Sequence, residues 1–414
     1  MFHWPLKRFD LACLSPVLIS LSILMCAGMA GAQETSGDLS GGAGIFRPKN
    51  PEAKRSSNRP TVRPTRPNPA RPNPAEIEEK FEDALAEGND ARDARKYAAA
   101  ESSYRDALKL KPRDARAHYG LGNVFADQQR WDEAEKIYRQ AIDISPNNAE
   151  AMMALSFVLV QPRTEGSNAT RFTDAESFAR RATQFQPKSA LAFDRLGVAK
   201  VARGLFNNDT EAAFRHAMEL DPGFVVAQVH LARVLRHMNR NSEADPLYKS
   251  AIERAQDAPT LVLIADAMQS ESRWNDSDPV LRRALELDAR NPGALFLMGR
   301  LLSVNRKYAE AEPVLKTAIE VNPKFFPAHN ILARSYLGLE RYDDAARIYE
   351  QAVPLAAEAD RRQLAGMFGF GGVGDGYMKT GRAKDALRAY ERALQLDPAN
   401  AELPGKIAAA RGKL

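Results

Sequence analysis

The residue pattern with the clearest potential for chemistry is a glycine run near the carboxyl end of the chain. Gly369-Phe-Gly371-Gly372-Val-Gly374 matches the spacing G-x-G-x-x-G, which lets a backbone approach the pyrophosphate of a dinucleotide. That fingerprint must follow a strand, whereas this run lies where a repeat described below places a helix. We therefore expect no cofactor there. Because each glycine weakens a helix by about 1 kcal/mol relative to alanine, we expect a loose segment.

Other residue types that support catalysis or metal binding are scarce. Cys13 and Cys26 are the only cysteines, and both lie in an amino-terminal apolar run. No histidine pair has the spacing with a glutamate that zinc proteases use, and His230 and His237, which share a helical face, have no carboxylate pair beside them. The sequence contains no G-x-S-x-G and no P-loop. We therefore expect neither a metal site nor catalytic residues, and we do not expect an enzyme.

The distribution of charge argues against a nucleic-acid partner. The 414 residues include 58 Lys and Arg against 53 Asp and Glu, which gives a formal charge of +5. Residues 33–75 alone hold eight Lys and Arg against three acidic residues, and residues 1–32 add a further +1, so that residues 76–414 sum to −1. A nucleic-acid-binding domain needs a basic face on its folded part. Here the excess of positive charge lies in a tail.

The first 75 residues predict export followed by a spacer. Lys7 and Arg8 precede an uncharged run from Leu11 to Ala32 that ends in small residues, as in a secretory signal peptide. We expect cleavage after residue 32, and the alternative is an uncleaved membrane anchor, because the run is long enough to span a bilayer. Residues 33–75, rich in Pro and Arg, predict a disordered extended linker. The expected location is the periplasm or another extracytoplasmic space, either free or anchored to the inner membrane.

Self-similarity with a period of about 34 residues organises the rest of the chain. An alanine, an aromatic residue four positions later and an alanine three positions after that recur: Ala134, Tyr138, Ala141; Ala345, Tyr349, Ala352; Ala386, Tyr390, Ala393. Prolines close several units, because proline cannot continue a helix: Pro112, Pro146, Pro222, Pro323 and Pro398. Aligning these residues gives nine units that start at 81, 115, 149, 190, 225, 258, 292, 326 and 367.

This pattern resembles the tetratricopeptide repeat family, whose units are helix-turn-helix hairpins. The fullest match to the family pattern comprises His118, Leu121, Gly122, Phe125, Ala134, Tyr138, Ala141 and Pro146. The resemblance implies an all-α fold, a right-handed superhelical solenoid of about nine repeats over residues 76–400. Residues 401–414 are expected to form a helix that caps the last repeat.

The resemblance also implies a protein-binding groove lined by the first helix of each unit. Positions 5, 9 and 12 of the units would face that groove, and they include Asn89, Tyr119, Asn123, Met153, Phe157, Val229, Arg233, Arg236, Phe296, Arg300, Asn330 and Arg334. Arginine binds carboxylates through paired hydrogen bonds, and asparagine binds peptide backbone. The expected partner is therefore an extended, acidic protein segment with apolar anchors. Asn330 and Arg334 resemble part of a carboxylate clamp, but the remaining lysines and asparagines are missing, so we do not expect capture of a carboxyl terminus.

The function expected from these features is that of an exported scaffold or adaptor that helps to assemble a cell-envelope complex. In the alternative, the basic Pro-rich tail binds an envelope polymer or a membrane surface and the repeats act as a spacer. The sequence leaves the partner and the oligomeric state open.

Overall fold

The computed structural model describes residues 73–161, 163 and 168–414. The expected signal segment and nearly all of the expected linker lie outside these residues. Within the described chain every regular element is a helix, so the predicted all-α fold of stacked helical hairpins is confirmed. The described chain divides into two compact units, and the division falls inside α11 (Asn241–Arg254), between residues 247 and 248. Each unit is described by itself below.

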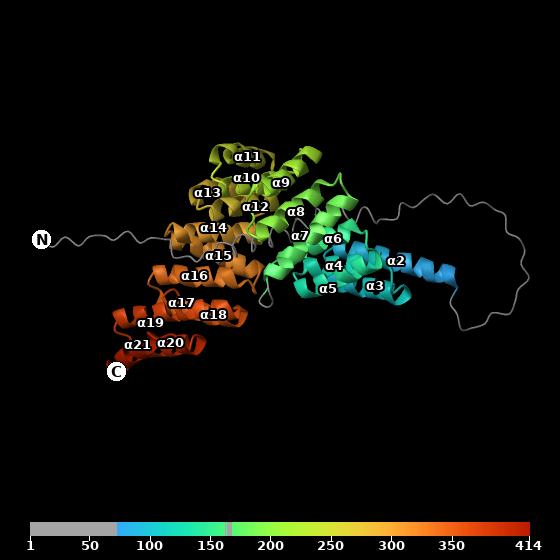
Figure 1. The fold of residues 1–414 in the computed structure, drawn as a ribbon. Helices are drawn as coiled ribbons and strands as arrows, with labels where there is room; N and C mark the ends of the chain where they lie inside the picture. The colour runs from blue at the N-terminus through green and yellow to red at the C-terminus, as the bar shows by residue number, and fades with distance from the viewer. Residues whose placement is uncertain (1–72, 162, 164–167) are drawn as a thin grey trace, which may run out of the picture. The chain divides into compact units, whose positions relative to one another are not determined.

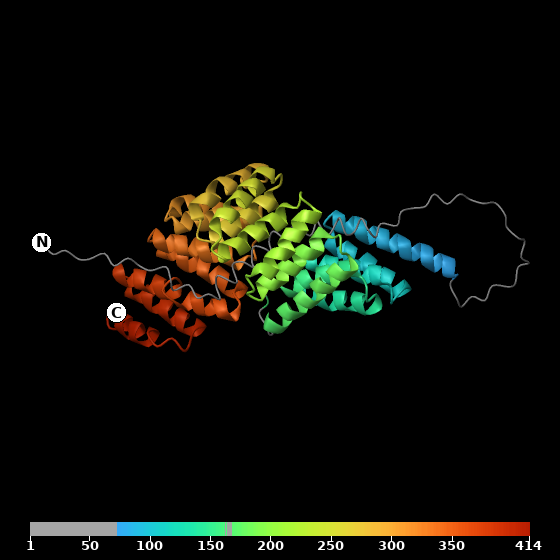
Figure 2. The ribbon, with the colours of Figure 1, turned by 45° about the horizontal axis from the view of Figure 1, so that its top comes forward.

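The N-terminal unit consists of successive antiparallel hairpins (Figures 1 and 2). Their helices are α2 (Pro74–Asp93) with α3 (Tyr97–Leu110), α4 (Ala115–Asp127) with α5 (Trp131–Ile144), α6 (Ala149–Leu159) with α7 (Asn168–Phe185), α8 (Ala190–Ala202) with α9 (Asn208–Leu220), and α10 (Val225–His237) before α11.

The C-terminal unit continues the same pattern. Its helices are α12 (Ala258–Ser270) with α13 (Trp274–Leu287), α14 (Pro292–Val304) with α15 (Tyr308–Val321), α16 (Phe326–Gly338) with α17 (Tyr342–Ala352), the 3-10 turn η2 (Val353–Leu355), α18 (Glu358–Ala365), α19 (Phe370–Lys379) with α20 (Ala383–Leu396), and α21 (Leu403–Arg411).

Seven of the nine predicted unit starts coincide with the first residue of a helix, namely those at 115, 149, 190, 225, 258, 292 and 326. The first unit differs, because α2 begins at Pro74 rather than at 81. Asn73 accepts a hydrogen bond from the backbone N–H of Ala75, and proline suits the first helical position. The last unit differs because the additional helix α18 precedes α19, which begins at Phe370 rather than at 367.

Helix caps and tight turns explain why the period is so regular. Several first helices begin after a residue whose side-chain oxygen accepts a hydrogen bond from a backbone N–H of the first turn: Asp114, Asn148, Ser189, Asp257 and Asn291. The turns inside the hairpins contain a residue in the left-handed region, which redirects the chain after the first helix: Arg95, Gln129, Gly204, Asn239, Ser272, Arg306, Glu340 and Gly381.

Small residues on first helices allow the aromatic residues of the second helices to pack in the core. Tyr138 is fully buried in α5, and a Cβ atom on Gly122 of α4 would lie 2.6 Å from its ring. Gly197 and Phe214 form the same kind of contact between α8 and α9, at 2.5 Å. The family pattern of a small residue followed by an aromatic residue therefore acts as a packing rule between the two helices of a hairpin.

The glycine run was expected to be loose, and this expectation is wrong. Residues 370–379 form α19, in which Val373 is fully buried. A Cβ atom on Gly374 would lie 2.4 Å from the Tyr390 ring, and one on Gly376 would lie 2.1 Å from the Tyr342 ring. These glycines lower helix propensity, but they let two tyrosine rings pack directly against the helix backbone.

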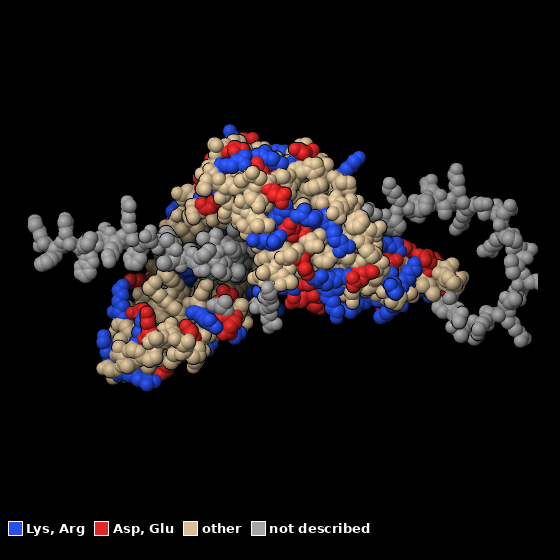
Figure 3. All heavy atoms as spheres, in the orientation of Figure 1, with Lys and Arg blue, Asp and Glu red and all other residues tan. Residues whose placement is uncertain are grey.

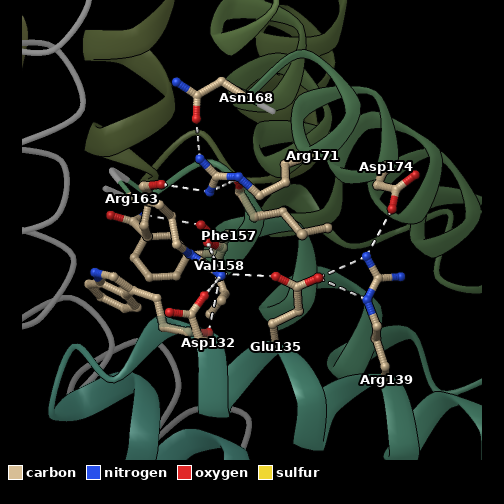
Figure 4. A network of polar contacts seen from close by, with 12 residues as sticks. Asp132, Glu135, Arg139, Phe157, Val158, Arg163, Asn168, Arg171 and Asp174 are labelled. Atoms are coloured by element: carbon tan, nitrogen blue, oxygen red, sulfur yellow. Dashed lines mark hydrogen bonds and ion pairs between the residues drawn. The ribbon is translucent and has the colours of Figure 1, made fainter. Parts of the chain in front are cut away.

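The insertion in the third repeat leaves α6 and α7 separated by a longer connection, of which residues 162 and 164–167 are not described. Figure 4 shows the contacts that fix its two ends. Arg163 pairs with Asp132 and with Glu135 of α5, the latter at 3.1 Å. Arg171 of α7 donates hydrogen bonds to the carbonyl oxygens of Leu159 and Gln161, at 3.3 and 3.1 Å. Both ends of the insertion are thus tied to the neighbouring helices.

Candidate protein-binding surface

Positions 5, 9 and 12 of the predicted repeats lie on the first helices, and the surface that they form is the first-helix face. In the N-terminal unit its two predicted asparagines take part in internal hydrogen bonds. Tyr104 donates to Asn89 Oδ1 at 2.7 Å, and Tyr138 donates to Asn123 Oδ1 at 2.6 Å. Asn123 is buried, whereas Asn89 is half-buried. These amides therefore join the two helices of their hairpins, a role that the sequence analysis did not assign to them.

The predicted aromatic and apolar residues of this unit are also packed. Tyr119 is buried with its ring centroid 6.0 Å from that of Tyr138, and burial raises the pKa of Tyr119 to about 12. Phe157 lies edge-on to Trp131 and beneath the guanidinium of Arg195. Met153 and Phe157 each keep only 6% of their surface exposed.

A buried acid–base pair in the N-terminal unit was missed by the sequence analysis. Asp194 of α8 is fully buried, and its Oδ1 lies 2.7 Å from Nδ1 of His230 in α10. Arg195 lies 3.4 Å from the other carboxylate oxygen. His230 and His237, which share a helical face in sequence, have different partners, because His237 stacks on Phe206. The signal available in the sequence was the separation of Asp194 and His230 by about one repeat.

The two predicted arginines of α10 differ from each other in burial and pairing. Arg233 is buried, with 8% of its surface exposed, and Val229 beside it is fully buried. Arg236 forms an ion pair with Asp245 of α11. Neither arginine is a freely exposed charge in this structure, because one is buried and the other is paired.

The C-terminal unit has four equivalent charged residues, one at position 9 of each predicted repeat: Asp266, Arg300, Arg334 and Asp375. Arg300 donates to Asp266 Oδ1 at 3.1 Å and to Gln269 Oε1 at 2.8 Å, and Asp266 is 1% exposed. Asp375 accepts hydrogen bonds from Tyr390 at 2.7 Å and from Lys406 of α21 at 2.8 Å. Three of the four charges therefore have partners inside the unit.

Arg334 is the exception. It is exposed, and it forms no hydrogen bond or ion pair within the described chain. Its guanidinium lies 4.8 Å from the ring centroid of Phe368, a residue that is itself 57% exposed. The repeat pattern indicates Arg334 but neither Phe368 nor its neighbour Met367, because its phase places both at the start of a helix. The signal that could have found them is the spacing of the last unit, 41 residues instead of 34.

The remaining predicted residues lie on α14 and α16, between Asp266 and Arg334 along the chain. Phe296 contacts Phe325 edge-on, with ring centroids 4.9 Å apart, and keeps 6% of its surface exposed. Phe296 therefore contributes to packing, whereas Asn330 is half-buried like Arg300, and Arg334 is the exposed residue among those predicted in this unit.

On the face that Figure 3 shows, positive and negative side chains are mixed rather than gathered by sign. Lys and Arg alternate with Asp and Glu over the face shown in Figure 3, and many of them form ion pairs between neighbouring hairpins, such as Arg130 with Glu101 and Arg341 with Glu312. Within the described residues, no group of three or more His, Cys, Asp or Glu side chains is arranged to hold a metal ion. No described helix is both long enough and apolar enough to cross a bilayer.

Tetratricopeptide repeat models match the chain in both compact units. One matches residues 85–149 and 296–360, and a second matches residues 370–400. Comparison with curated proteins found no match.

Several solved structures are similar to this chain. The tetratricopeptide protein TTC0263 of Thermus thermophilus is 23% identical, with a TM-score of 0.40, over 46% of this chain and 99% of that chain. Pseudomonas aeruginosa pilF is 18% identical, with a TM-score of 0.41, over 52% of this chain and 94% of that chain. A chain of the APC/C hetero-tetramer Cut9-Hcn1 is 12% identical, with a TM-score of 0.40, over 81% of this chain and 90% of that chain.

Proposed function

Because the chain belongs to the tetratricopeptide repeat family, we propose that it is an exported scaffold that binds another protein on the first-helix face of its hairpins. The family fold supports the general role of a protein-interaction scaffold. The finer parts of the proposal, which are export and the assembly of a cell-envelope complex, rest on the amino-terminal sequence.

The observation that carries the proposal is the difference among the four charges of the C-terminal unit. Asp266, Arg300 and Asp375 have internal partners, whereas Arg334 is exposed beside the half-buried Asn330. An arginine and an amide on one helix, α16, can bind the carboxylate and the backbone of an extended segment from another protein. This arrangement supports a binding role for the first-helix face of this unit.

Affinity capture from an envelope extract, with the full chain as bait, tests the proposal. A partner recovered by the parent should be recovered less well by the double variant Asn330→Ala, Arg334→Gln. Arg388→Gln is the matched control, because Arg388 is 70% exposed on the second helix α20. Reversing the charge of all four predicted arginines is unsuitable, because it would place glutamate at residue 300 against the buried Asp266. Equal recovery by the parent and the double variant would overturn the groove assignment.

Export has its own test. Amino-terminal sequencing of the protein isolated from its cells should find Gln33 as the first residue, and fractionation should place the protein outside the cytoplasm. An intact amino terminus with membrane association would indicate an uncleaved anchor. A cytoplasmic protein would contradict export.

The alternative function assigns binding to the tail. It is favoured by the charge of +5 in residues 33–75 against −1 in residues 76–414. Deleting residues 33–75 would then abolish retention in the envelope while partner capture stays intact. If retention is unchanged by the deletion, the tail has no such role.

A further inference from the structure

The turn between α18 and α19, residues 366–369, has a backbone that is held in place from several sides. Gly369 N–H donates to the carbonyl oxygen of Gly366 at 3.0 Å, and Gly372 N–H donates to the same oxygen at 3.3 Å. A Cβ atom on Gly369 would lie 2.0 Å from the carbonyl oxygen of Leu364, and one on Gly372 would lie 1.9 Å from that of Met367. The turn is therefore built on glycine at both positions, because no other residue fits there.

A hydrogen bond from a buried tyrosine also holds this turn in place. The hydroxyl of Tyr349, a fully buried residue of α17, donates to the carbonyl oxygen of Phe368 at 2.5 Å. Burial raises the pKa of Tyr349 above its ordinary value, which already lies well above neutral pH, so the hydroxyl is protonated and acts as a donor. The preceding hairpin thus sets the position of residue 368.

This fixed turn presents two large apolar side chains to solvent. Met367 is 67% exposed and Phe368 is 57% exposed, which makes Phe368 the most exposed phenylalanine of the described chain. Apolar surface left in water is unfavourable, and adjacent exposed apolar side chains often mark a site of interaction. Exposure here does not result from a lack of local structure, because the backbone beneath these side chains is hydrogen-bonded.

Arg334 adds a charge to this apolar pair. Its guanidinium lies 4.8 Å from the Phe368 ring centroid, and it has no carboxylate partner within the described chain. A guanidinium that stacks on an aromatic face keeps the N–H groups along its edge available for a carboxylate. The equivalent Arg300 already satisfies its N–H groups with Asp266 and Gln269. Arg334 is thus the cation of this series that a partner can neutralise.

We propose that Met367, Phe368 and Arg334 form a docking site for an extended acidic segment of a partner protein, in which an apolar side chain is adjacent to a carboxylate. The carboxylate pairs with the edge of Arg334, and the apolar side chain covers Met367 and Phe368. This inference rests on the proposed scaffold function, and it specifies the place and the chemistry of its partner. The site depends on the insertion that created α18, so it occurs once in the described chain rather than at each repeat.

Titration of the full chain with defined peptides tests the site directly. The probe is a fluorescein-labelled peptide that alternates glutamate with phenylalanine, and binding is followed by fluorescence anisotropy. Two matched peptides replace every glutamate by lysine or every phenylalanine by serine. We expect binding of the first peptide, at least about tenfold weaker binding of the other two, and weakening by added salt.

Substitutions in the proposed site test where on the protein the peptide binds. Arg334→Gln and Phe368→Ala should each weaken the acidic aromatic peptide about tenfold, which corresponds to one charge-assisted contact or one buried aromatic anchor. The controls are Arg388→Gln and Phe185→Ala, which change an arginine that is 70% exposed on α20 and a phenylalanine that is 48% exposed on α7. Thermal unfolding should be unchanged in all four variants, because each changed side chain lies at the surface. Arg334→Lys keeps the charge but loses the planar fork, so its affinity should lie between those of the parent and Arg334→Gln.

Three results would overturn the docking site. The first is that the lysine peptide binds as tightly as the acidic peptide, and the second is that Arg334→Gln and Phe368→Ala bind the acidic peptide undiminished. The third is that the parent is a dimer and Phe368→Ala makes it a monomer, which would identify a second copy of the chain as the occupant. Failure of this site is distinguishable from failure of the scaffold function. If both variants still capture the parent's partner from the envelope extract, the docking site falls and Arg334 loses its assigned role on the first-helix face, while the general function of a protein-binding scaffold stands. If the parent captures no partner, the scaffold function falls, and the peptide titration still decides on the site.

Discussion

Arginines at equivalent positions of the C-terminal unit have opposite roles. Arg300 neutralises the buried Asp266, whose second oxygen, Oδ2, has no hydrogen-bond partner within the described chain. Arg334, one repeat later, has no internal ion pair within the same described residues. A buried charge that loses its only partner is costly, whereas an exposed charge contributes little to stability.

This difference predicts a large effect of one substitution at Arg300 and a small effect of the same substitution at Arg334. Arg300→Met should lower the free energy of unfolding by about 3 kcal/mol, because Asp266 is left charged and buried. Arg334→Met should change it by less than about 0.5 kcal/mol. Urea unfolding followed by circular dichroism measures both. Replacing the pair together, with Asp266→Leu and Arg300→Met, should recover most of the loss, and a double variant as unstable as Arg300→Met would contradict the assigned ion pair.

Asp343 provides a prediction of pH dependence. Hydrogen bonds from Arg382 and then from Tyr377 lower the pKa of the Asp343 carboxyl below its ordinary value. A depressed pKa contributes stability above the ordinary value of about 3.9, and the contribution is lost as the pH falls through the lower, folded-state pKa. The side chain is 71% exposed, so solvent screening limits the contribution. Asp343→Asn should therefore cost about 0.5 kcal/mol near pH 7.

The measurement is urea unfolding of the parent and of Asp343→Asn at decreasing pH. The difference in unfolding free energy should shrink as the pH falls below about 4. Arg382→Gln is the reference background, in which Asp343→Asn should have a smaller effect because the main hydrogen-bond donor is gone. A difference that grows towards acid pH would show that the carboxylate is not stabilised by these partners.

At the scale of elements, α19 shows that a helix rich in glycine can be well packed. Two of its glycines, Gly374 and Gly376, lie where tyrosine rings of α20 and α17 approach the backbone. The low intrinsic propensity of the segment is offset by contacts that depend on the absence of a side chain. Gly405 in α21 has no such role, because nothing lies within 4 Å of a Cβ atom placed on it.

Replacing glycine by alanine is expected to change the stability in opposite directions at Gly374 and at Gly405. Gly374→Ala should destabilise the protein by about 2 kcal/mol, because the new methyl group overlaps the Tyr390 ring. Gly405→Ala should stabilise it by about 0.5 to 1 kcal/mol, because alanine has the higher helix propensity and the space is open. Thermal or chemical unfolding measures both. Stabilisation by Gly374→Ala would show that the glycine run is loosely packed after all.

At the scale of the whole molecule, the described chain is a series of hairpins that contact mainly their neighbours in sequence. In such an array a local change should act over a short distance. The last hairpin is covered by α21, where Leu403, Ile407 and Ala410 are buried and Lys406 pairs with Asp375.

Weakening this cover should therefore have a local effect. Ile407→Ala should lower the local stability by about 2 kcal/mol and speed amide hydrogen exchange in α19, α20 and α21. Exchange in α4 and α5 of the N-terminal unit should not change. Lys413→Ala, at an exposed position, is the control. Faster exchange throughout the N-terminal unit would show that the two units unfold as one cooperative body.

The helices and their order follow from the amino-acid sequence alone. The recurring Ala and Tyr positions, the closing prolines and the capping residues act over one or two turns of chain, so the period located seven helix starts, those of α4, α6, α8, α10, α12, α14 and α16. The sequence also selected the first helices as the candidate binding face, and it named Asn330 and Arg334.

Whether those residues are free to bind a partner follows instead from the contacts between helices. Arg300 and Arg334 have the same residue type at the same repeat position, but the preceding repeat supplies Asp266 to the first, whereas the inserted turn supplies Phe368 to the second. Similarly, the pairing of Asp194 with His230 and the packing of tyrosines on the glycine run join residues of different helices. A periodic sequence determines where each helix begins and which residues share a face. The contribution of a charged residue or a glycine to stability depends on the side chains that a neighbouring helix places beside it.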